Sequence, residues 1–226
     1  MNQSQHAPSQ RYLELVSQCR DLHENGDRGR NIPSEKTFAG YSLYEQAVRI
    51  ERMIRLTGAK RVLDYGCGKG KQYDAEIVDV PGDKQKRTII DFWNVDVVHC
   101  YDAGYAPFSR KPEGTFDGVI STDMLEHCAD QDIPWILAEL FAYADRFVFA
   151  SIAAYASNKT LPNGDNAHVT VRPLKWWRQH FAQAAAAKPN TLWEIWVEER
   201  PAGATPLETR FGSFLWLDTV QQVPRV

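Results

Sequence analysis

The feature that most constrains the fold is the stretch from Val62 to Gly70, in which a short apolar run ends in Asp64 and three glycines follow at alternate positions. This pattern is typical of a buried parallel strand that breaks into a tight turn over a nucleotide-like ligand. Glycines allow positive φ angles and let the backbone approach a ligand, because they have no Cβ atom. We therefore expect an α/β fold in which the N–H groups of this turn face a ligand.

The spacing of the glycines narrows the choice of ligand. A dinucleotide fingerprint, G-x-G-x-x-G, would need its third glycine at position 71, where the chain has Lys71. A P-loop is excluded for this stretch because Lys69 is followed by a glycine and not by Ser or Thr. The motif alone leaves two interpretations, a turn that binds a ligand without a phosphate cradle and a glycine-rich turn that binds nothing.

The stretch resembles motif I of the class I S-adenosylmethionine (SAM) dependent methyltransferases, an apolar strand followed by D/E-x-G-x-G-x-G. Asp64, Gly66, Gly68 and Gly70 occupy its four defined positions. The resemblance implies that the turn, including Cys67, passes under the methionine part of SAM and that Asp64 lies near its amino group. It also implies a three-layer Rossmann-like fold, with a mostly parallel seven-stranded sheet and a C-terminal antiparallel strand pair.

Length and charge limit the other possibilities. At 226 residues the chain can bury one substantial core, and we expect a helical arm over residues 1–33 and a methyltransferase domain over residues 34–226. Lys and Arg number 26 against 29 Asp and Glu, a formal net charge of −3, and no basic run is denser than residues 84–87. Proteins that hold a nucleic-acid backbone usually carry a basic excess. A small molecule, sugar or nucleotide unit is therefore the expected methyl acceptor.

The spacing of the cysteines and the lengths of the apolar segments bear on the cellular location of the protein. Cys19, Cys67, Cys100 and Cys128 lie far apart, with no C-x-x-C pair and no metal-binding spacing, so we expect reduced thiols and no metal. The sequence shows no basic start followed by an apolar h-region and no run of 18 or more apolar residues. We expect a cytoplasmic location without membrane association.

Two helical patterns precede the glycine turn. Apolar residues at helical spacing predict a short amphipathic helix over residues 11–24. A second helix is predicted to begin at a capping box formed by Ser42 and Glu45 and to end at Gly58. In the family that the chain resembles, the segment before such a helix often closes over SAM, which makes residues 38–41 a candidate lid. Core packing is the alternative for its two aromatic side chains.

A second acid ends the β-prone run that begins at Val97. In nucleoside-binding α/β folds, a carboxylate at the end of the second strand accepts hydrogen bonds from both ribose hydroxyls, and we assign this role to Asp102. It lies 38 positions after Asp64, whereas about 20 after the glycine turn is usual. The extra length predicts an exposed excursion over residues 73–93. If that excursion itself contained the second strand, Asp91 would bind the ribose instead.

A third segment, from Phe116 to His127, resembles the fourth-strand region of the same family, where F-D-x-V precedes a short apolar strand and then D-x-L-E-H. The resemblance implies that Thr122 and Asp123 lie at the cofactor. The alternative is that Asp123 and Glu126 cap a helix whose first turn contains His127. The glycine turn, the strand-end acid and this segment occur in the family's order. Between Asp102 and Phe116 the sequence contains no convincing third strand, so we expect that strand to be very short or missing.

The C-terminal half predicts the other elements of the sheet. A buried strand is expected over residues 147–152, followed by a polar loop over residues 161–168 at its carboxyl end, where open α/β sheets bind their ligands. A helix with Trp177 on its inward face comes next. Residues 193–197 and 211–217 are expected to form the closing antiparallel pair.

Methyl transfer from a sulfonium is an in-line displacement, so the main task of such an enzyme is to align donor and acceptor. A hydroxyl or ammonium acceptor must also lose a proton, for which a histidine is suited. His168 and His127 are the candidates, and His168 is favoured because its loop is expected to cover the acceptor, with Asn166 and Trp177 binding the substrate. A loop histidine that is only held by hydrogen bonds is the alternative interpretation.

The sequence disfavours two kinds of DNA methylation and leaves two alternatives to small-molecule methylation. Cytosine C5 methylation uses a cysteine that usually follows a proline, and no cysteine here does so. The [DNS]-P-P-[YF] tetrapeptide of amino methylation of DNA bases is absent. The alternatives are a non-catalytic SAM- or nucleoside-binding subunit and an enzyme that uses SAM for different chemistry. The sequence does not distinguish methylation of oxygen from methylation of nitrogen.

Overall fold

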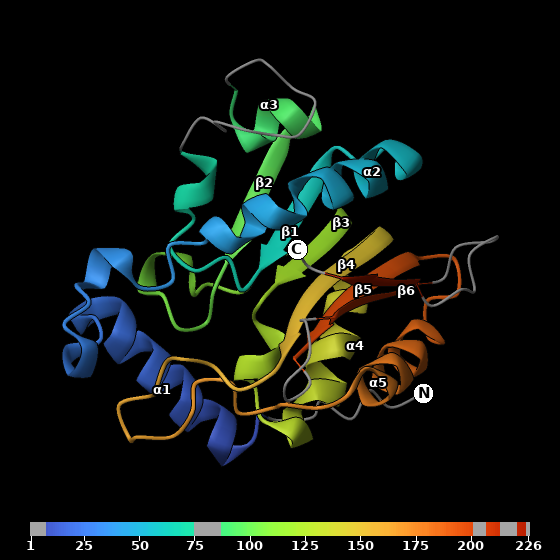
Figure 1. Ribbon diagram of the computed structural model, residues 1–226. Helices are drawn as coiled ribbons and strands as arrows, with labels where there is room; N and C mark the ends of the chain where they lie inside the picture. The colour runs from blue at the N-terminus through green and yellow to red at the C-terminus, as the bar shows by residue number, and fades with distance from the viewer. Residues whose placement is uncertain (1–7, 75–86, 201–206, 213–220, 225–226) are drawn as a thin grey trace.

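A five-stranded, all-parallel β-sheet with helices on both faces forms the centre of the molecule (Figure 1). The computed structural model describes residues 8–74, 87–200, 207–212 and 221–224. The neighbouring strands follow the order β2-β1-β3-β4-β5. Their bounds are β1 (Arg61–Tyr65), β2 (Val97–Tyr101), β3 (Phe116–Thr122), β4 (Ala144–Ala154) and β5 (Leu192–Glu199).

Alternate residues of the strands face two separate helical layers, as the twofold periodicity of a strand requires. One face of the sheet packs against α2 and α3, and the opposite face packs against α4 and α5, an arrangement that is visible in Figure 1. Val62 belongs to the first core and Leu63, the next residue, to the second. The helices are α1 (Gln10–Asn25), α2 (Ala47–Thr57), α3 (Ile89–Trp93), α4 (Ile133–Tyr143) and α5 (Leu174–Ala185).

After β5 the chain extends the sheet at its β5 edge. There β6 (Leu207–Gly212) runs antiparallel to β5, and β7 (Gln221–Pro224) runs antiparallel to β6. Positions 213–217 of the predicted closing strand lie outside the described residues. The seven-stranded architecture as a whole thus stays a prediction, whereas the α/β fold with a parallel five-stranded sheet is observed.

The segment between β2 and β3 agrees with the prediction that the third strand is very short or missing. All of its residues are described, and they contain one 3₁₀ turn, Ala106–Phe108, and no strand. The second strand is Val97–Tyr101, as predicted for the run that ends at Asp102. The alternative ribose acid, Asp91, lies in α3 with an exposed side chain, so that alternative is wrong. Residues 75–86 of the predicted excursion lie outside the described residues.

The predicted capping box before α2 is wrong. Residues Tyr41–Gln46 form a 3₁₀ helix without a side-chain cap, and the α-helix begins only at Ala47. Gly58 does end the helix, in the left-handed conformation that favours glycine. The first predicted helix is confirmed as α1, whose N-terminus is capped by Ser9.

Candidate functional site

A cavity of about 420 Å³ opens at the carboxyl ends of the parallel strands, where α/β sheets hold their ligands. The volume lies within the range of small-molecule and cofactor sites. The register pairs Tyr65 with Tyr101 at the ends of β1 and β2, so the turns that follow these strands meet in one place. The lining comes from α1, residues 36–42, the glycine turn, and the segments after β2, β3 and β4.

The glycine turn has the backbone geometry that its sequence predicts. Gly66, Gly68 and Gly70 all have positive φ angles, of 91°, 60° and 70°. A Cβ atom on Gly66 would overlap the side chain of Met124, and one on Gly68 would overlap the carbonyl oxygen of Phe38. The glycines are therefore required by close packing of the turn against two neighbouring segments of protein.

The N–H groups of this turn are already occupied by protein acceptors, contrary to the prediction that they face a ligand. Those of Gly66 and Cys67 donate to the carbonyl of Tyr101, at 2.7 and 3.2 Å. The N–H of Gly68 donates to the carboxylate of Asp102 at 2.9 Å, and that of Lys69 to the carbonyl of Phe38 at 2.8 Å. The turn is thus held rigidly between the end of β2 and the segment before α2.

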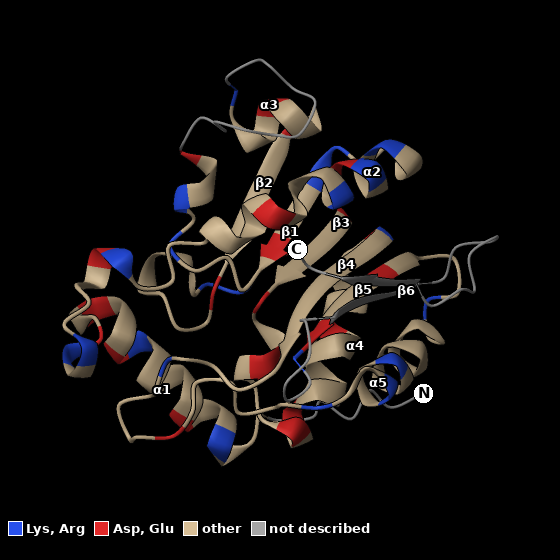
Figure 2. Ribbon diagram, viewed as in Figure 1, with Lys and Arg blue, Asp and Glu red and all other residues tan. Residues whose placement is uncertain are grey.

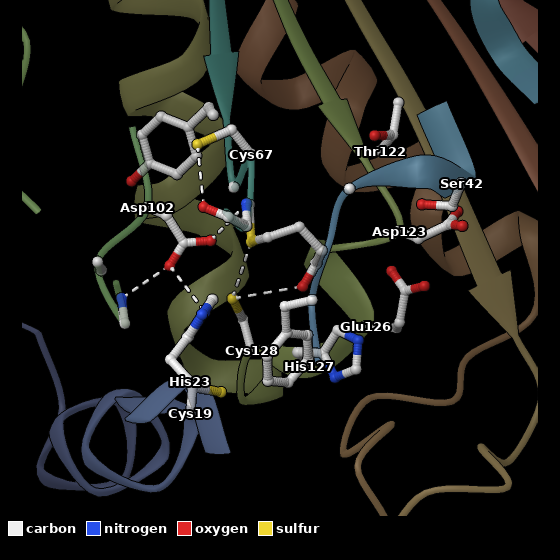
Figure 3. Close-up of a pocket in the computed structure, with 18 of the residues that line it drawn as sticks. Cys19, His23, Ser42, Cys67, Asp102, Thr122, Asp123, Glu126, His127 and Cys128 are labelled. Carbon is white, nitrogen blue, oxygen red and sulfur yellow. Dashed lines mark hydrogen bonds and ion pairs between the residues drawn. The ribbon is translucent and has the colours of Figure 1, made fainter. Parts of the chain in front are cut away.

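Asp102 lies directly after β2 and lines the cavity, as predicted (Figure 3). One of its carboxylate oxygens accepts from the N–H of Gly68, and the other accepts from the N–H of Gly104 at 2.8 Å. Burial raises the pKa of Asp102 to about 6, and these two hydrogen bonds act in the opposite direction because they favour the charged form. The carboxylate is charged at neutral pH and fixed in orientation.

Asp64 does not line the cavity. Its side chain is fully buried on the other side of the turn, where one oxygen accepts from the amide of Gln72 at 3.1 Å and from the hydroxyl of Tyr73 at 2.7 Å. Burial raises its pKa to about 7, an effect that these two hydrogen bonds partly oppose. In this structure Asp64 stabilises the turn through Gln72 and Tyr73. Its side chain does not face the cavity in which the ligand amino group was expected.

Helix α1, which was predicted only as an arm, supplies a wall of the cavity. Its lining residues recur at helical spacing, and two of them, Cys19 and His23, are polar residues on an otherwise apolar face. Polar residues on an otherwise apolar helix face were the sequence signal that could have indicated a role of α1 in the site. The lining residues from this helix are Tyr12, Leu15, Val16, Cys19 and His23.

His23 connects α1 to the glycine turn. Its ring stacks on Tyr105 with 4.8 Å between centroids, and its Nδ1 lies 2.9 Å from the Nζ of Lys69. The ammonium group can only donate, so Nδ1 accepts and the proton of the neutral ring is on Nε2. Burial, together with the positive charge of Lys69, lowers the pKa of His23 to about 3. His23 therefore stays neutral in the folded protein.

The predicted lid, residues 38–41, lies against the cavity next to α1. Phe38 has a positive φ angle of 46°, unusual for a residue with a Cβ atom, and its ring is 4.8 Å from that of His23. Tyr41 also lines the cavity, although half of its surface is exposed to solvent. This segment is held in place by the hydrogen bond from Lys69, so in this structure it is a closed wall.

The segment after β3 brings a buried acid and a histidine to the opposite end of the cavity from Asp102 (Figure 3). Glu126 is fully buried, and burial raises its pKa well above the usual range. One of its oxygens accepts from the N–H of Ala153 at 3.1 Å, and the other has no hydrogen-bond partner. From the sequence, Glu126 was interpreted as part of the D-x-L-E-H segment or as a helix cap, and it was not predicted as a site residue.

His127 and His168 meet at this end of the cavity, with 4.9 Å between their ring centroids and nearly perpendicular planes. Nδ1 of His127 lies 2.7 Å from the carbonyl oxygen of Ala167, and Nδ1 of His168 lies 2.7 Å from that of Tyr155. A carbonyl can only accept, so both Nδ1 atoms carry the proton and both Nε2 atoms are free in the neutral rings. Burial lowers the pKa of His127 to about 4 and also lowers that of His168.

The helix-cap interpretation of the segment after β3 is wrong. The structure has only a three-residue 3₁₀ turn there, Leu125–His127, with no side-chain cap. Asp123 has a positive φ angle of 50° and accepts a hydrogen bond from Ser151 at 2.8 Å, which ties the end of β3 to β4.

Neither of the two predicted substrate-binding residues lines the cavity. Trp177 is fully buried in the core between α5 and the sheet, so its assignment as a pocket wall is corrected. The amide of Asn166 is used within its own loop, donating to the carbonyl of Ser157 and accepting from the N–H groups of Ser157 and His168. Asn166 thus positions His168. The predicted residues that line the cavity are Gly66, Cys67, Gly68, Asp102, Thr122, Asp123, His127 and His168.

Other expectations can be compared with the described residues. All four cysteines are free thiols. Within the described part of the chain, none of the helices combines the length and the apolar character needed to cross a bilayer. Figure 2 shows Lys and Arg interspersed with Asp and Glu along α1 and α2.

Comparisons of the chain with models of protein families, with curated proteins and with solved structures gave no match. The sequence motifs and the geometry of the cavity are therefore the indications of function.

Proposed function

We propose that the protein is a Rossmann-like methyltransferase that binds SAM in this cavity and transfers the methyl group to a hydroxyl or amine of a small molecule, sugar or nucleotide. The observation that carries the proposal is the convergence of three segments on one cavity. The glycine turn, Asp102 and the Thr122–His127 segment follow three adjacent parallel strands, β1, β2 and β3, in the order that the family motifs have along the sequence. The predicted seven-stranded sheet with its closing pair is part of this proposal, and the pairing of Ile195 with Phe211 is in keeping with it.

The donor would lie across the ends of β1 and β2. Its methionine part would lie along Gly66, Cys67 and Gly68, and its ribose hydroxyls would donate to Asp102. A carboxylate can accept about four hydrogen bonds, and Asp102 accepts one backbone N–H at each oxygen, so acceptor capacity is left for a vicinal diol. Thr122 and Asp123 line the same cavity on the β3 side, where they would complete the cofactor site.

The acceptor would lie at the end of the cavity that contains His127 and His168. The free Nε2 of His168 is a suitable base because its ring is neutral and is held in orientation by the bond from Nδ1 to Tyr155. The reaction would move the methyl carbon from sulfur to the acceptor atom while the electron pair of the broken C–S bond stays on sulfur. Alignment of the two reactants by the cavity walls would be the main source of rate enhancement.

The proposal is tested by incubating the purified chain with labelled SAM and a panel of small hydroxyl and amine compounds, and by measuring S-adenosylhomocysteine. Acceptor-dependent formation of S-adenosylhomocysteine is the expected result. Tight binding of SAM without turnover on any acceptor would favour the non-catalytic subunit, and no binding of SAM at all would overturn the assignment of the cavity.

The ribose role of Asp102 gives a sharper binding test. We expect Asp102→Asn to weaken SAM binding about 10-fold or more in calorimetry, because charge-assisted hydrogen bonds to the diol are lost. Asp91→Asn is the matched control: this acid is exposed in α3, away from the cavity lining, and its replacement should leave the affinity unchanged. Equal affinities of the two variants would show that Asp102 does not hold the ribose.

A further inference from the structure

We propose that Glu126, His127 and His168 form a binding site for a divalent transition-metal ion at the acceptor end of the cavity. The spacing of the cysteines predicts no metal site, and these three residues do not form a metal-binding motif in the sequence. Binding of the ion does not depend on the proposed methyl transfer. Its suggested role in the reaction, given below, rests on that proposed function.

The first observation is that the three side chains converge. One oxygen of Glu126, one nitrogen of His127 and one nitrogen of His168 all lie within 4.8 Å of one another. Ligand atoms bound to one ion at about 2.0–2.2 Å are separated by roughly 3–3.5 Å. Side-chain shifts on the order of 1 Å would therefore bring all three onto a common ion.

The second observation is the orientation of the two imidazole rings. Nδ1–H of His127 donates to the carbonyl of Ala167, and Nδ1–H of His168 donates to that of Tyr155, both at 2.7 Å. Metal-binding histidines usually donate their other ring N–H to a carbonyl or carboxylate, which sets the tautomer and the ring orientation. Both rings here meet that condition, and Asn166 further holds the backbone of His168.

The third observation is the unpartnered oxygen of Glu126. The side chain is fully buried, one oxygen accepts from Ala153, and the other has no hydrogen-bond partner. A buried polar atom without a partner is costly, and the cost is larger for a carboxylate. A cation between this oxygen and the histidines would satisfy it. Figure 3 shows Glu126 and His127 side by side at this end of the cavity.

The donor set points to a transition metal. Two imidazole nitrogens and one carboxylate oxygen suit Zn²⁺, Mn²⁺, Fe²⁺ or Co²⁺, whereas Mg²⁺ and Ca²⁺ prefer sites made of oxygen ligands alone. Asp123 and Lys159, which have opposite formal charges, also line the cavity, and Glu126 is the one acidic side chain of the donor set.

Three protein ligands leave coordination positions open toward the cavity, as in catalytic metal sites. A hydroxyl group of the acceptor that bound there would release its proton to water more readily, because the ion stabilises the resulting alkoxide. That oxygen would then displace the sulfur at the methyl carbon. With the ion bound, His168 would be a ligand and not the base.

The test is direct binding of Co²⁺, Zn²⁺ and Mn²⁺ to the full chain. The protein is stripped with a chelator, dialysed separately against each ion, and analysed for bound metal, with Co²⁺ also followed by its visible absorption. We expect about one ion per chain for at least one of the three and a Co²⁺ spectrum typical of nitrogen and oxygen ligands. Less than a tenth of an equivalent for all three ions would overturn the inference.

Substitutions identify the ligands. His168→Gln should weaken Co²⁺ binding at least 10-fold, because one of three ligands is lost. His180→Gln is the matched control, since His180 also directs Nδ1 to a carbonyl, that of Trp176 at 2.9 Å, but belongs to α5 and not to the cavity lining. Equal binding by these two variants would contradict the site.

Folding and turnover are measured on the same proteins. His168 is only half-buried on a loop, so its variant is suited to the test, and thermal unfolding without metal checks that it folds. At one Co²⁺ concentration, the midpoint of unfolding should rise more for the wild type than for His168→Gln. Methylation that persists in protein shown to hold no metal would sink the catalytic role of the ion and leave the methyltransferase proposal intact. Metal binding without methylation of any acceptor would contradict the methyltransferase proposal and leave the metal site intact.

Discussion

At the scale of single residues, the cavity is surrounded by titratable groups that burial pushes toward their neutral forms. Burial raises the pKa of Asp64 to about 7 and that of Asp102 to about 6, and it lowers the pKa of His23 to about 3. The pKa rises for the two acids and falls for the histidine. In each case the neutral form is favoured, because surroundings of low dielectric constant disfavour charge. These residues can therefore be examined through the pH dependence of stability as well as through activity.

His23 should make the protein sensitive to mild acid. Its pKa is about 3 in the folded state and 6.5 in the unfolded state, so the stability it contributes is complete above pH 6.5 and is lost as pH falls toward 3. Between pH 7.5 and pH 5 the loss should be about 2 kcal/mol in the free energy of unfolding. Urea unfolding of His23→Gln at the two pH values should show a smaller difference than in the wild type, by about that amount. Identical differences in the two proteins would assign the acid sensitivity elsewhere.

Gly66 should be the least replaceable residue of the turn. It has a φ angle of 91°, and a Cβ atom there would overlap Met124. Gly66→Ala should lower the free energy of unfolding by more than about 2 kcal/mol, because the cost of the φ angle adds to the steric overlap. Gly114→Ala separates the two effects: its φ angle is 77°, but no atom lies within 4 Å of the added Cβ. That control should cost only about 1 kcal/mol in the same urea unfolding experiment, and equal losses would mean that packing at Gly66 is unimportant.

At the scale of elements, α1 differs most from its prediction, because the expected N-terminal arm forms a wall of the cavity. Its N-terminus is docked by Asp132, which accepts from the N–H of Ser9 at 3.0 Å and from the Ser9 hydroxyl at 2.5 Å. Further along, Leu15 and Leu22 pack against Leu161 and Ala167 in the loop that carries His168. The helix thus covers the carboxyl ends of the strands and connects the two ends of the cavity.

A ligand in the cavity should therefore protect α1 from hydrogen exchange. We expect SAM to slow amide exchange in Gln10–Asn25, because bound ligand stabilises the closed arrangement of its walls. Exchange in α5, Leu174–Ala185, serves as the internal control, since that helix supplies no lining residue. Mass spectrometry of both segments with and without SAM makes the comparison. Protection of α5 without protection of α1 would show that the ligand binds elsewhere.

At the scale of the whole molecule, the cavity lies where the direction of chain travel across the sheet reverses. From β1 the chain moves to β2 on one side, and β3 then lies on the other side of β1. Loops that leave adjacent strands on opposite sides of the sheet diverge, and the crevice between them is the usual ligand site of an open α/β fold. Helix α1 and the loop after β4 add further lining residues, so positions as distant as 12 and 168 contribute to the same cavity.

The sequence by itself determined the elements whose signals are local. The strand that ends at Tyr65, the three glycines with positive φ angles, the strand before Asp102 and the missing third strand all follow from short patterns, because strand burial and turn geometry depend on neighbouring residues. The capping box failed for the opposite reason: its two residues fit the motif, yet packing of Leu43 into the core accompanies a 3₁₀ turn at that point.

Only the tertiary structure decided which side chains share the site. It placed Trp177 in the core, Asp64 behind the turn, and α1 over the cavity, none of which is encoded in a local pattern. It also brought His168 to within 4.8 Å of Glu126 and His127, although 41 positions separate the two histidines. The physical reason is that such contacts depend on how whole strands and loops pack, and that packing is set by the complete core and not by the residues that meet.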